Sequence, residues 1–207
     1  MIIKCYNENH PYLLFIDIEF DNTHLIQFAG LLFKRIDADG SYQLQTSINQ
    51  YVSAKVGYPF MEYTGINNSF LDENGVPLSS LRTLIFDDVL GDIPMKDIMI
   101  ISHGLRNDRL VLNRNGINLS QYADEKGAWK PIDGYCTFNN DKRILNRNDH
   151  VSAADLANQF GYYLHNAHNA YKEQIIVPDS IHAMNNFIEP DLYWNSVKDF
   201  IKKYIKN

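Results

Sequence analysis

The chain has 207 residues, of which 45% are hydrophobic, 13% aromatic and 21% charged, a composition that excludes a disordered or fibrous protein. The length fits one compact domain, and we expect residues 1–207 to form it. The net charge of -6, from 19 Lys and Arg against 25 Asp and Glu, excludes the broad basic field with which many duplex-binding proteins gather phosphates. Two cysteines, Cys5 and Cys136, are too few for the disulfide framework of a small secreted fold.

The N-terminal half begins with three predicted strands. Residues 11–19 and 24–35 are apolar and β-prone, and the turn residues Asp21 and Asn22 separate them, which predicts an antiparallel hairpin. A second turn at residues 37–40 (DADG) leads to a third strand around residues 42–52. We therefore expect three consecutive antiparallel strands, followed by a loop that contains Pro59 and Gly65.

Helices and strands then alternate. Apolar residues at helical spacing predict a helix over residues 77–89, and the continuous apolar run 97–102 predicts a strand buried on both faces. Further elements are expected at 107–113 (helix), 134–138 (strand), 152–161 and 169–177 (helices) and 190–207 (a C-terminal amphipathic helix). This order predicts an α/β fold, with a mixed sheet of five strands flanked by helices.

Asp17 and Glu19 are the first candidate site residues. They stand at positions i and i+2 of a strand, so their side chains share one face and can reach one cation. Four apolar residues precede Asp17, which places its carboxylate where a buried strand emerges. A pair of acids that caps a solvated hairpin is the structural alternative, and this pattern alone favours that alternative.

Asp108 is the second candidate. If the strand at 97–102 ends near Ser102, Asp108 lies in the first turn of the next helix, where the helix dipole also favours a carboxylate. Taken alone, Asp108 is better explained as a structural capping acid.

His168 and Glu173 are the third candidate pair. They are five residues apart, so they can share a site only if His168 lies in the loop before the helix that carries Glu173. An exposed His and a surface Glu are the simpler interpretation of any single pair of this kind. His165 is a competing choice for the His, but Ala170 stands five residues after it and cannot bind a metal.

Taken together, these segments resemble the DEDD superfamily of 3′→5′ exonucleases, and specifically its His-containing DEDDh branch. The matching segments are FIDIEF (15–20), HLIQFAGLLF (24–33), TGINNSFL (64–71), SHGLRNDRLVL (102–112) and VSAADLANQFGYYLHNAHNAYKEQ (151–174). They follow the family's order and spacing over most of residues 12–177. The resemblance implies a ribonuclease H-like fold and a single exonuclease domain.

The resemblance also implies roles for individual residues. It makes Asp17, Glu19 and Asp108 metal ligands, His168 the general base, and Glu173 the fourth acid, where the family usually has Asp. Two neighbouring positions depart from the family's pattern. Phe20 follows Glu19 in place of the usual Thr, and His103 is followed by Gly104 in place of Asn. We assign Phe20 and His103 to substrate binding, while a core position remains the more common role for an aromatic such as Phe20.

The implied cofactors are two divalent cations, Mg²⁺ or Mn²⁺, which relieve the repulsion between converging carboxylates. The implied partner is the 3′ end of a single-stranded DNA or RNA, and a homodimer or a polymerase association stays open. The apolar run Leu13 to Ile18 is too short for a membrane span, so we expect no membrane partner and a cytoplasmic location. A nucleic-acid-binding module weakened in catalysis through Glu173 is the alternative function.

Overall fold

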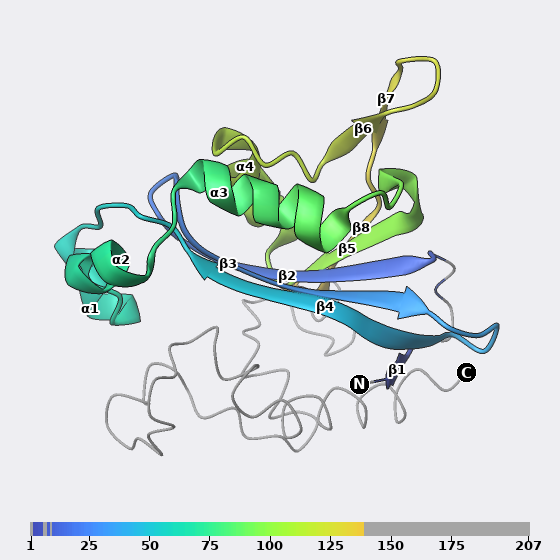
Figure 1. Ribbon diagram of the computed structural model, residues 1–207, viewed down its shortest axis with the longest axis horizontal. Coiled ribbons are helices and arrows are strands. Elements are labelled where there is room, and N and C mark those ends of the chain that lie inside the picture. Colours follow the sequence, from blue (N-terminus) through green and yellow to red (C-terminus); the bar gives the residue numbers. More distant parts are fainter. Residues whose placement is uncertain (1, 6–7, 9, 139–207) are drawn as a thin grey trace.

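A mixed sheet of six strands forms the centre of the fold (Figure 1). The computed structural model describes residues 2–5, 8 and 10–138. The strands occur in the order β1-β4-β3-β2-β5-β8. Their bounds are Ile2–Lys4 (β1), Tyr12–Asp21 (β2), His24–Arg35 (β3), Ser41–Tyr51 (β4), Ile98–Ser102 (β5) and Gly134–Cys136 (β8). The predicted α/β class with a mixed sheet is confirmed.

The three long strands β2, β3 and β4 are antiparallel, as predicted. The turn between β2 and β3 places Asn22 at φ 56°, a left-handed conformation that Asn tolerates better than most residues. Near this turn the register shifts, because Glu19 pairs with Gln27 whereas Phe20 pairs with Leu25. Ile26 is therefore an extra residue on β3, which is a β-bulge.

The predicted number of five strands is wrong by one. β5 pairs parallel with β2, and β8 pairs parallel with β5, which gives the five strands expected. The sixth strand is β1, which pairs antiparallel with β4 at the edge of the sheet. β1 has three residues, too few for the alternation of apolar and polar residues that marks a strand in sequence.

Three helical segments cover one face of the sheet (Figure 1). α3 (Leu78–Thr83) continues directly into the π-helical segment η1 (Leu84–Leu90), and α4 (Leu105–Arg114) follows β5. A short 3₁₀ helix, η2 (Met95–Asp97), leads into β5. The main core lies between these helices and the sheet, and its members include Leu14, Ile16, Phe28, Leu81, Ile85 and Leu112. The helices predicted at 77–89 and 107–113 are thus present. The second of them, α4, begins two residues earlier and ends one residue later than predicted.

The region expected as a loop contains two short helices. α1 (Tyr58–Thr64) and α2 (Asn68–Asn74) lie together at one end of the sheet (Figure 1), where Ile26, Tyr51, Val56, Ile66 and Leu71 form a separate core. The sequence analysis also did not predict a two-stranded hairpin, which projects from the sheet. It consists of β6 (Gln121–Ala123) and β7 (Trp129–Pro131). These elements are short and mostly exposed, so periodicity in the sequence gives little sign of them.

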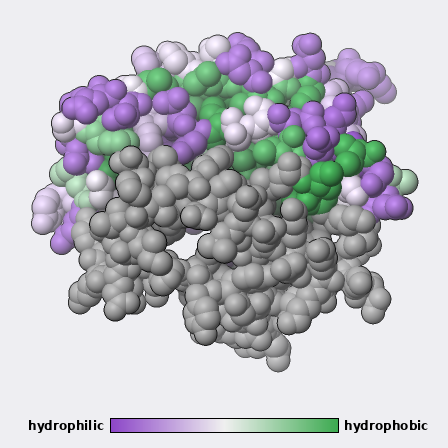
Figure 2. All heavy atoms as spheres, turned by 60° about the horizontal axis from the view of Figure 1, so that its bottom comes forward, coloured by the Kyte–Doolittle hydropathy of each residue, from purple (hydrophilic) through white to green (hydrophobic). Residues whose placement is uncertain are grey.

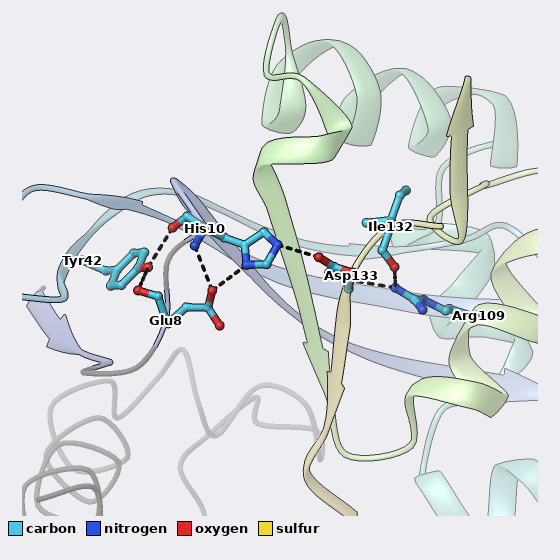
Figure 3. A network of polar contacts seen from close by, with 6 residues as sticks. All are labelled: Glu8, His10, Tyr42, Arg109, Ile132 and Asp133. Atoms are coloured by element: carbon cyan, nitrogen blue, oxygen red, sulfur yellow. Dashed lines mark hydrogen bonds and ion pairs between the residues drawn. The ribbon is translucent and has the colours of Figure 1, made fainter. Parts of the chain in front are cut away.

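A polar network joins the segment before β2 to the start of β8 (Figure 3). The His10 ring lies between two carboxylates, with Nδ1 bonded to Glu8 and Nε2 2.9 Å from Oδ2 of Asp133. The Tyr42 hydroxyl donates to the His10 carbonyl at 2.7 Å, and Arg109 donates to the Asp133 carbonyl at 3.2 Å. Because both ring nitrogens face acceptors, the network is strongest when His10 is protonated.

Several predictions fall on residues outside the described part of the chain. These are the helices at 152–161, 169–177 and 190–207, and with them the extent of the single domain. Within the described residues, no helix is long and apolar enough to cross a membrane.

Seen from the side opposite α3, the described surface carries hydrophobic residues between hydrophilic margins (Figure 2).

Candidate active site

Asp17 and Glu19 lie where β2 extends beyond the end of its parallel neighbour β5. The last register pair between the two strands is Phe15 with Ile101, and β5 ends one residue later at Ser102. Ile16 and Ile18 point into the main core beneath the helices, so the alternating Asp17 and Glu19 project from the opposite face. The carboxyl end of a parallel strand is where ligands gather in α/β sheets.

Asp108 reaches the same region from α4. The helix begins at Leu105, which places Asp108 in its first turn, as predicted. The Ser102 hydroxyl donates to Oδ2 of Asp108 and accepts from the Gly104 backbone N–H at 3.1 Å. Asp108 is buried, with 8% of its surface exposed. The end of β5 and the start of α4 are thus joined through this one carboxylate.

The three carboxylates influence one another electrostatically. Desolvation raises the pKa of Glu19 to about 7, and the charges of Asp17 and Asp108 add to this rise. Desolvation together with the charge of Asp108 raises the pKa of Asp17 to about 6. The side chain of Asp17 is exposed at the surface, and access of solvent reduces both effects on its pKa. Burial also raises the pKa of Asp108, although its hydrogen bond with Ser102 acts in the opposite direction.

The donor set fits a divalent cation, although the described part of the chain does not complete a site. The three carboxylates provide the oxygen ligands that Mg²⁺ and Mn²⁺ prefer, and a cation would relieve the repulsion that adds to burial in raising the pKa values of Asp17 and Glu19. Among residues 2–5, 8 and 10–138, no group of three His, Cys, Asp or Glu side chains is close enough to hold a metal ion by itself.

A polar row beside Glu19 was missed in the sequence. Glu19 pairs with Gln27 across β2 and β3, and Gln27 pairs with Tyr51 across β3 and β4. Gln27 is fully buried and donates to Oδ1 of Asn49 at 2.7 Å. Burial and then the charge of Glu19 raise the pKa of Tyr51 to about 12, although a hydrogen bond with Gln27 opposes the shift. Gln27 is a polar residue within the apolar run of β3, and this was the feature of the sequence that could have indicated the polar row.

Phe20 and His103 both have structural contacts. Phe20 is half-buried and packs against the main core, which agrees with the core position considered as the alternative to substrate binding. The Nδ1 atom of His103 lies 2.9 Å from the Thr137 hydroxyl, and its ring meets Phe138 edge-on with 5.6 Å between centroids. These contacts connect His103 to the segment that follows β8. A role in substrate binding stays a prediction for both residues.

His168, Glu173 and the competing His165 lie outside the described residues. Of the five residues predicted for catalysis and metal binding, the described part of the chain contains Asp17, Glu19 and Asp108, which are close enough for the charges of Asp17 and Asp108 to act on Glu19.

Comparisons with known proteins give matches in structure alone. Neither the models of protein families nor the curated proteins contain a match to this sequence. Exonuclease X in complex with 5′ overhanging duplex DNA is similar with a TM-score of 0.51 and 13% identity, covering 94% of both chains. The chain has a mixed-sheet α/β fold of the ribonuclease H-like type, which it shares with this exonuclease.

Two other solved structures match a smaller part. A 3′-exonuclease in a structure of 3′-end specific recognition of histone mRNA stem-loop has a TM-score of 0.50 and 10% identity, with 76% of this chain and 73% of that chain covered. E. coli exonuclease I with an oligonucleotide has a TM-score of 0.47 and 15% identity. The match covers 65% of this chain and 30% of that exonuclease I chain. At such identities, these similarities describe the fold alone.

Proposed function

We propose that the chain is a metal-dependent 3′→5′ exonuclease of the DEDDh branch, which hydrolyses single-stranded DNA or RNA to nucleoside 5′-monophosphates. The observation that carries this proposal is the position of Asp17 and Glu19 on β2 beside Asp108 at the start of α4, where burial and then the neighbouring negative charges raise the pKa values of Asp17 and Glu19. The fold shared with exonucleases supports it, and so do the nucleic acids named with two of its structural neighbours, a histone mRNA stem-loop and a duplex DNA.

The proposed mechanism assigns a task to each of the chain's own groups. Asp17, Glu19 and Asp108, with Glu173, would hold two divalent cations, Mg²⁺ or Mn²⁺, which supply charge neutralisation and a readily deprotonated water. The Ser102 hydroxyl orients the carboxylate of Asp108 through its hydrogen bond. His168 accepts the proton of the attacking water, because an unperturbed imidazole, with a pKa of ~6.5, is suited to this near neutral pH.

Digestion of end-labelled strands tests the proposal. Single-stranded DNA and RNA, labelled at either end, are incubated with Mg²⁺ or Mn²⁺, and stepwise shortening from the 3′ end is expected. Asp17→Ala should lower the rate at least about 100-fold, because it removes a charge that a bound cation needs. Asp88→Ala, which changes an exposed acid on η1, is the matched control and should retain the rate. Shortening from the 5′ end, or equal activity in Asp17→Ala, would contradict the proposal.

A binding module with weakened catalysis is the second candidate. It is favoured by Glu173, which is one methylene longer than the Asp usual in the family and would displace a ligand in a site that tolerates little misplacement. Strand binding without hydrolysis, together with hydrolysis gained in Glu173→Asp, would support this second candidate.

A further inference from the structure

The side chain of Asn115 connects the end of α4 to the turn between β2 and β3. Its Nδ2 donates to the carbonyl of Thr23 at 2.8 Å and to the carbonyl of Val111 at 2.8 Å. Its Oδ1 accepts from the backbone N–H of Leu25 at 3.3 Å. One amide thus joins a helix to a hairpin that is about 90 residues earlier in the sequence.

These contacts fix α4 at its second end. The first end is held by the hydrogen bond between Ser102 and Asp108. Asn115 follows Asp108 by seven residues, which is close to two helical turns, so the two side chains leave the helix on the same side. Leu112 lies between them on that side and is fully buried in the main core.

The hairpin that Asn115 contacts is the one that carries the other two carboxylates. β2 contains Asp17 and Glu19, and it ends at Asp21, two residues before Thr23. A displacement of the turn relative to α4 would therefore change the spacing between Glu19 and Asp108. No other side chain among the described hydrogen bonds joins α4 to this turn.

We propose that Asn115 is a positioning residue, which sets the carboxylate of Asp108 on α4 against those of Asp17 and Glu19 on β2. The proposal rests on the proposed function, since it concerns the spacing of the same metal ligands. An amide is needed because the site offers both carbonyl acceptors and an N–H donor. Asp at this position accepts but cannot donate, so it keeps the bond from Leu25 and loses the bonds to Thr23 and Val111.

The backbone at Asn115 has a separate anchor. Arg82 of α3 donates to its carbonyl through Nε at 3.0 Å and Nη2 at 2.7 Å. Because a carbonyl is present in every variant, substitutions of Asn115 remove the contacts to the hairpin while this anchor remains. The variants thus test the bridge from α4 to the turn.

The test compares Asn115→Asp with Asn113→Asp. Asn113 lies in the last turn of the same helix, and its Nδ2 donates to the nearby Ser120 hydroxyl at 2.9 Å, without contact to the hairpin. Both variants add the same charge at the same helix end. For Asn115→Asp we expect the Mn²⁺ concentration at half-maximal hydrolysis to rise about 10-fold, with the rate at saturating Mn²⁺ changed less than about threefold. For Asn113→Asp we expect a change below about twofold.

Direct Mn²⁺ binding, measured by calorimetry in the absence of nucleic acid, should show the same shift. A contact that serves stability alone would lower the melting temperature of the protein and leave the Mn²⁺ dependence unchanged, and this result would overturn the proposal. An equal shift in both variants would overturn it too. If Asn115→Asp does not fold, Asn115→Gln replaces it, and a smaller shift in the same direction is expected. If the parent protein neither binds Mn²⁺ nor hydrolyses strands, the proposed function fails instead.

Discussion

Glu19 stands between two kinds of neighbours, and both affect its charge. On one side are the like charges of Asp17 and Asp108, which favour the protonated carboxyl. On the other side is the neutral polar row of Gln27 and Tyr51 on β3 and β4, with Gln27 fully buried. A bound cation stabilises a carboxylate in this environment more than it stabilises an exposed carboxylate, because little water is present to screen the negative charge.

The raised pKa of Glu19 predicts a pH-dependent stability of the metal-free protein. Its carboxyl holds a proton more tightly in the folded than in the unfolded chain, so stability decreases as pH rises from about 4.5 through about 7. Glu19→Gln should weaken this dependence and raise the melting temperature at pH 7.5. Each 1 kcal/mol gained in the free energy of unfolding corresponds to a rise of about 2–4 °C. Thermal unfolding in EDTA measures the effect.

Two controls accompany this measurement. Burial lowers the pKa of His10, but Glu8 and Asp133 outweigh burial and raise it, so His10 also loses its stabilising charge as pH rises. The comparison with the parent protein removes this contribution, which both proteins share. Glu62→Gln changes an exposed acid on α1 and should leave the pH dependence as it is. An unchanged pH dependence in Glu19→Gln would contradict the prediction.

At the scale of elements, α4 holds the site through close packing against β8. A Cβ atom at Gly134, the first residue of β8, would lie 2.5 Å from Cδ2 of Leu105 and 2.7 Å from Nη2 of Arg109. Leu105 is the first residue of α4 and is buried in the main core. The absence of a side chain at Gly134 therefore determines how near the first turn of α4, with Asp108, can approach the sheet.

Gly134→Ala should displace the first turn of α4. We expect a loss of about 1–3 kcal/mol in the free energy of unfolding, as for other overpacked positions, together with a lower rate of hydrolysis. Urea unfolding and the digestion assay measure the two effects. Gly57→Ala is the control, because a Cβ there meets its nearest atoms at 3.6 and 3.7 Å, which is ordinary contact. Equal stability of both variants would contradict this account of α4.

Elements with a clear period were predictable from the sequence, and elements without one were not. The hairpin of β2 and β3, the buried β5 and the helix with Asp108 followed from apolar patterns and turn residues. α1 has no buried residue, and β7 is exposed at every position, so neither produces a pattern. Among the candidate site residues, Asp17, Glu19 and Asp108 were selected by the family resemblance together with their places in the strand and the helix. Asn115 could not be found in this way, because its three partners are backbone groups that only the folded chain brings near.

For the whole molecule, charge predicts how a strand would be bound. The net charge of -6 means that acids outnumber the 19 Lys and Arg side chains, so under the proposed function we expect the binding free energy to come chiefly from the cation site and from contacts with bases. This distinguishes the chain from proteins that bind nucleic acids through a basic surface, whose affinity falls steeply with salt.

We expect a weak dependence of strand binding on salt. Between 50 and 200 mM KCl, a protein with ~6–10 phosphate contacts loses ~10³–10⁵ in affinity, and we expect a loss below about 10-fold here. Fluorescence anisotropy of the parent protein with Ca²⁺ in place of Mg²⁺ or Mn²⁺, which keeps the ligands of the proposed cation site intact, measures the affinity. A loss of 100-fold or more would indicate a cationic path for the strand that the net charge conceals.

The β-bulge at Ile26 limits where this chain can change its length. The extra residue lets β3 serve two cores, because Leu25 and Phe28 pack beneath the helices while Ile26 packs with Val56 and Leu71 near α1 and α2. Deleting Ile26 would leave Glu19 opposite Gln27 and Phe20 opposite Leu25, but it would remove the side chain that packs with Val56 and Leu71. The hairpin of β3 and β4 has a second register shift, between Leu32 and Phe33, where Gln45 is the extra residue on β4. Ile26 is fully buried and Gln45 is exposed, so deletions among relatives should be rarer at Ile26 than at Gln45.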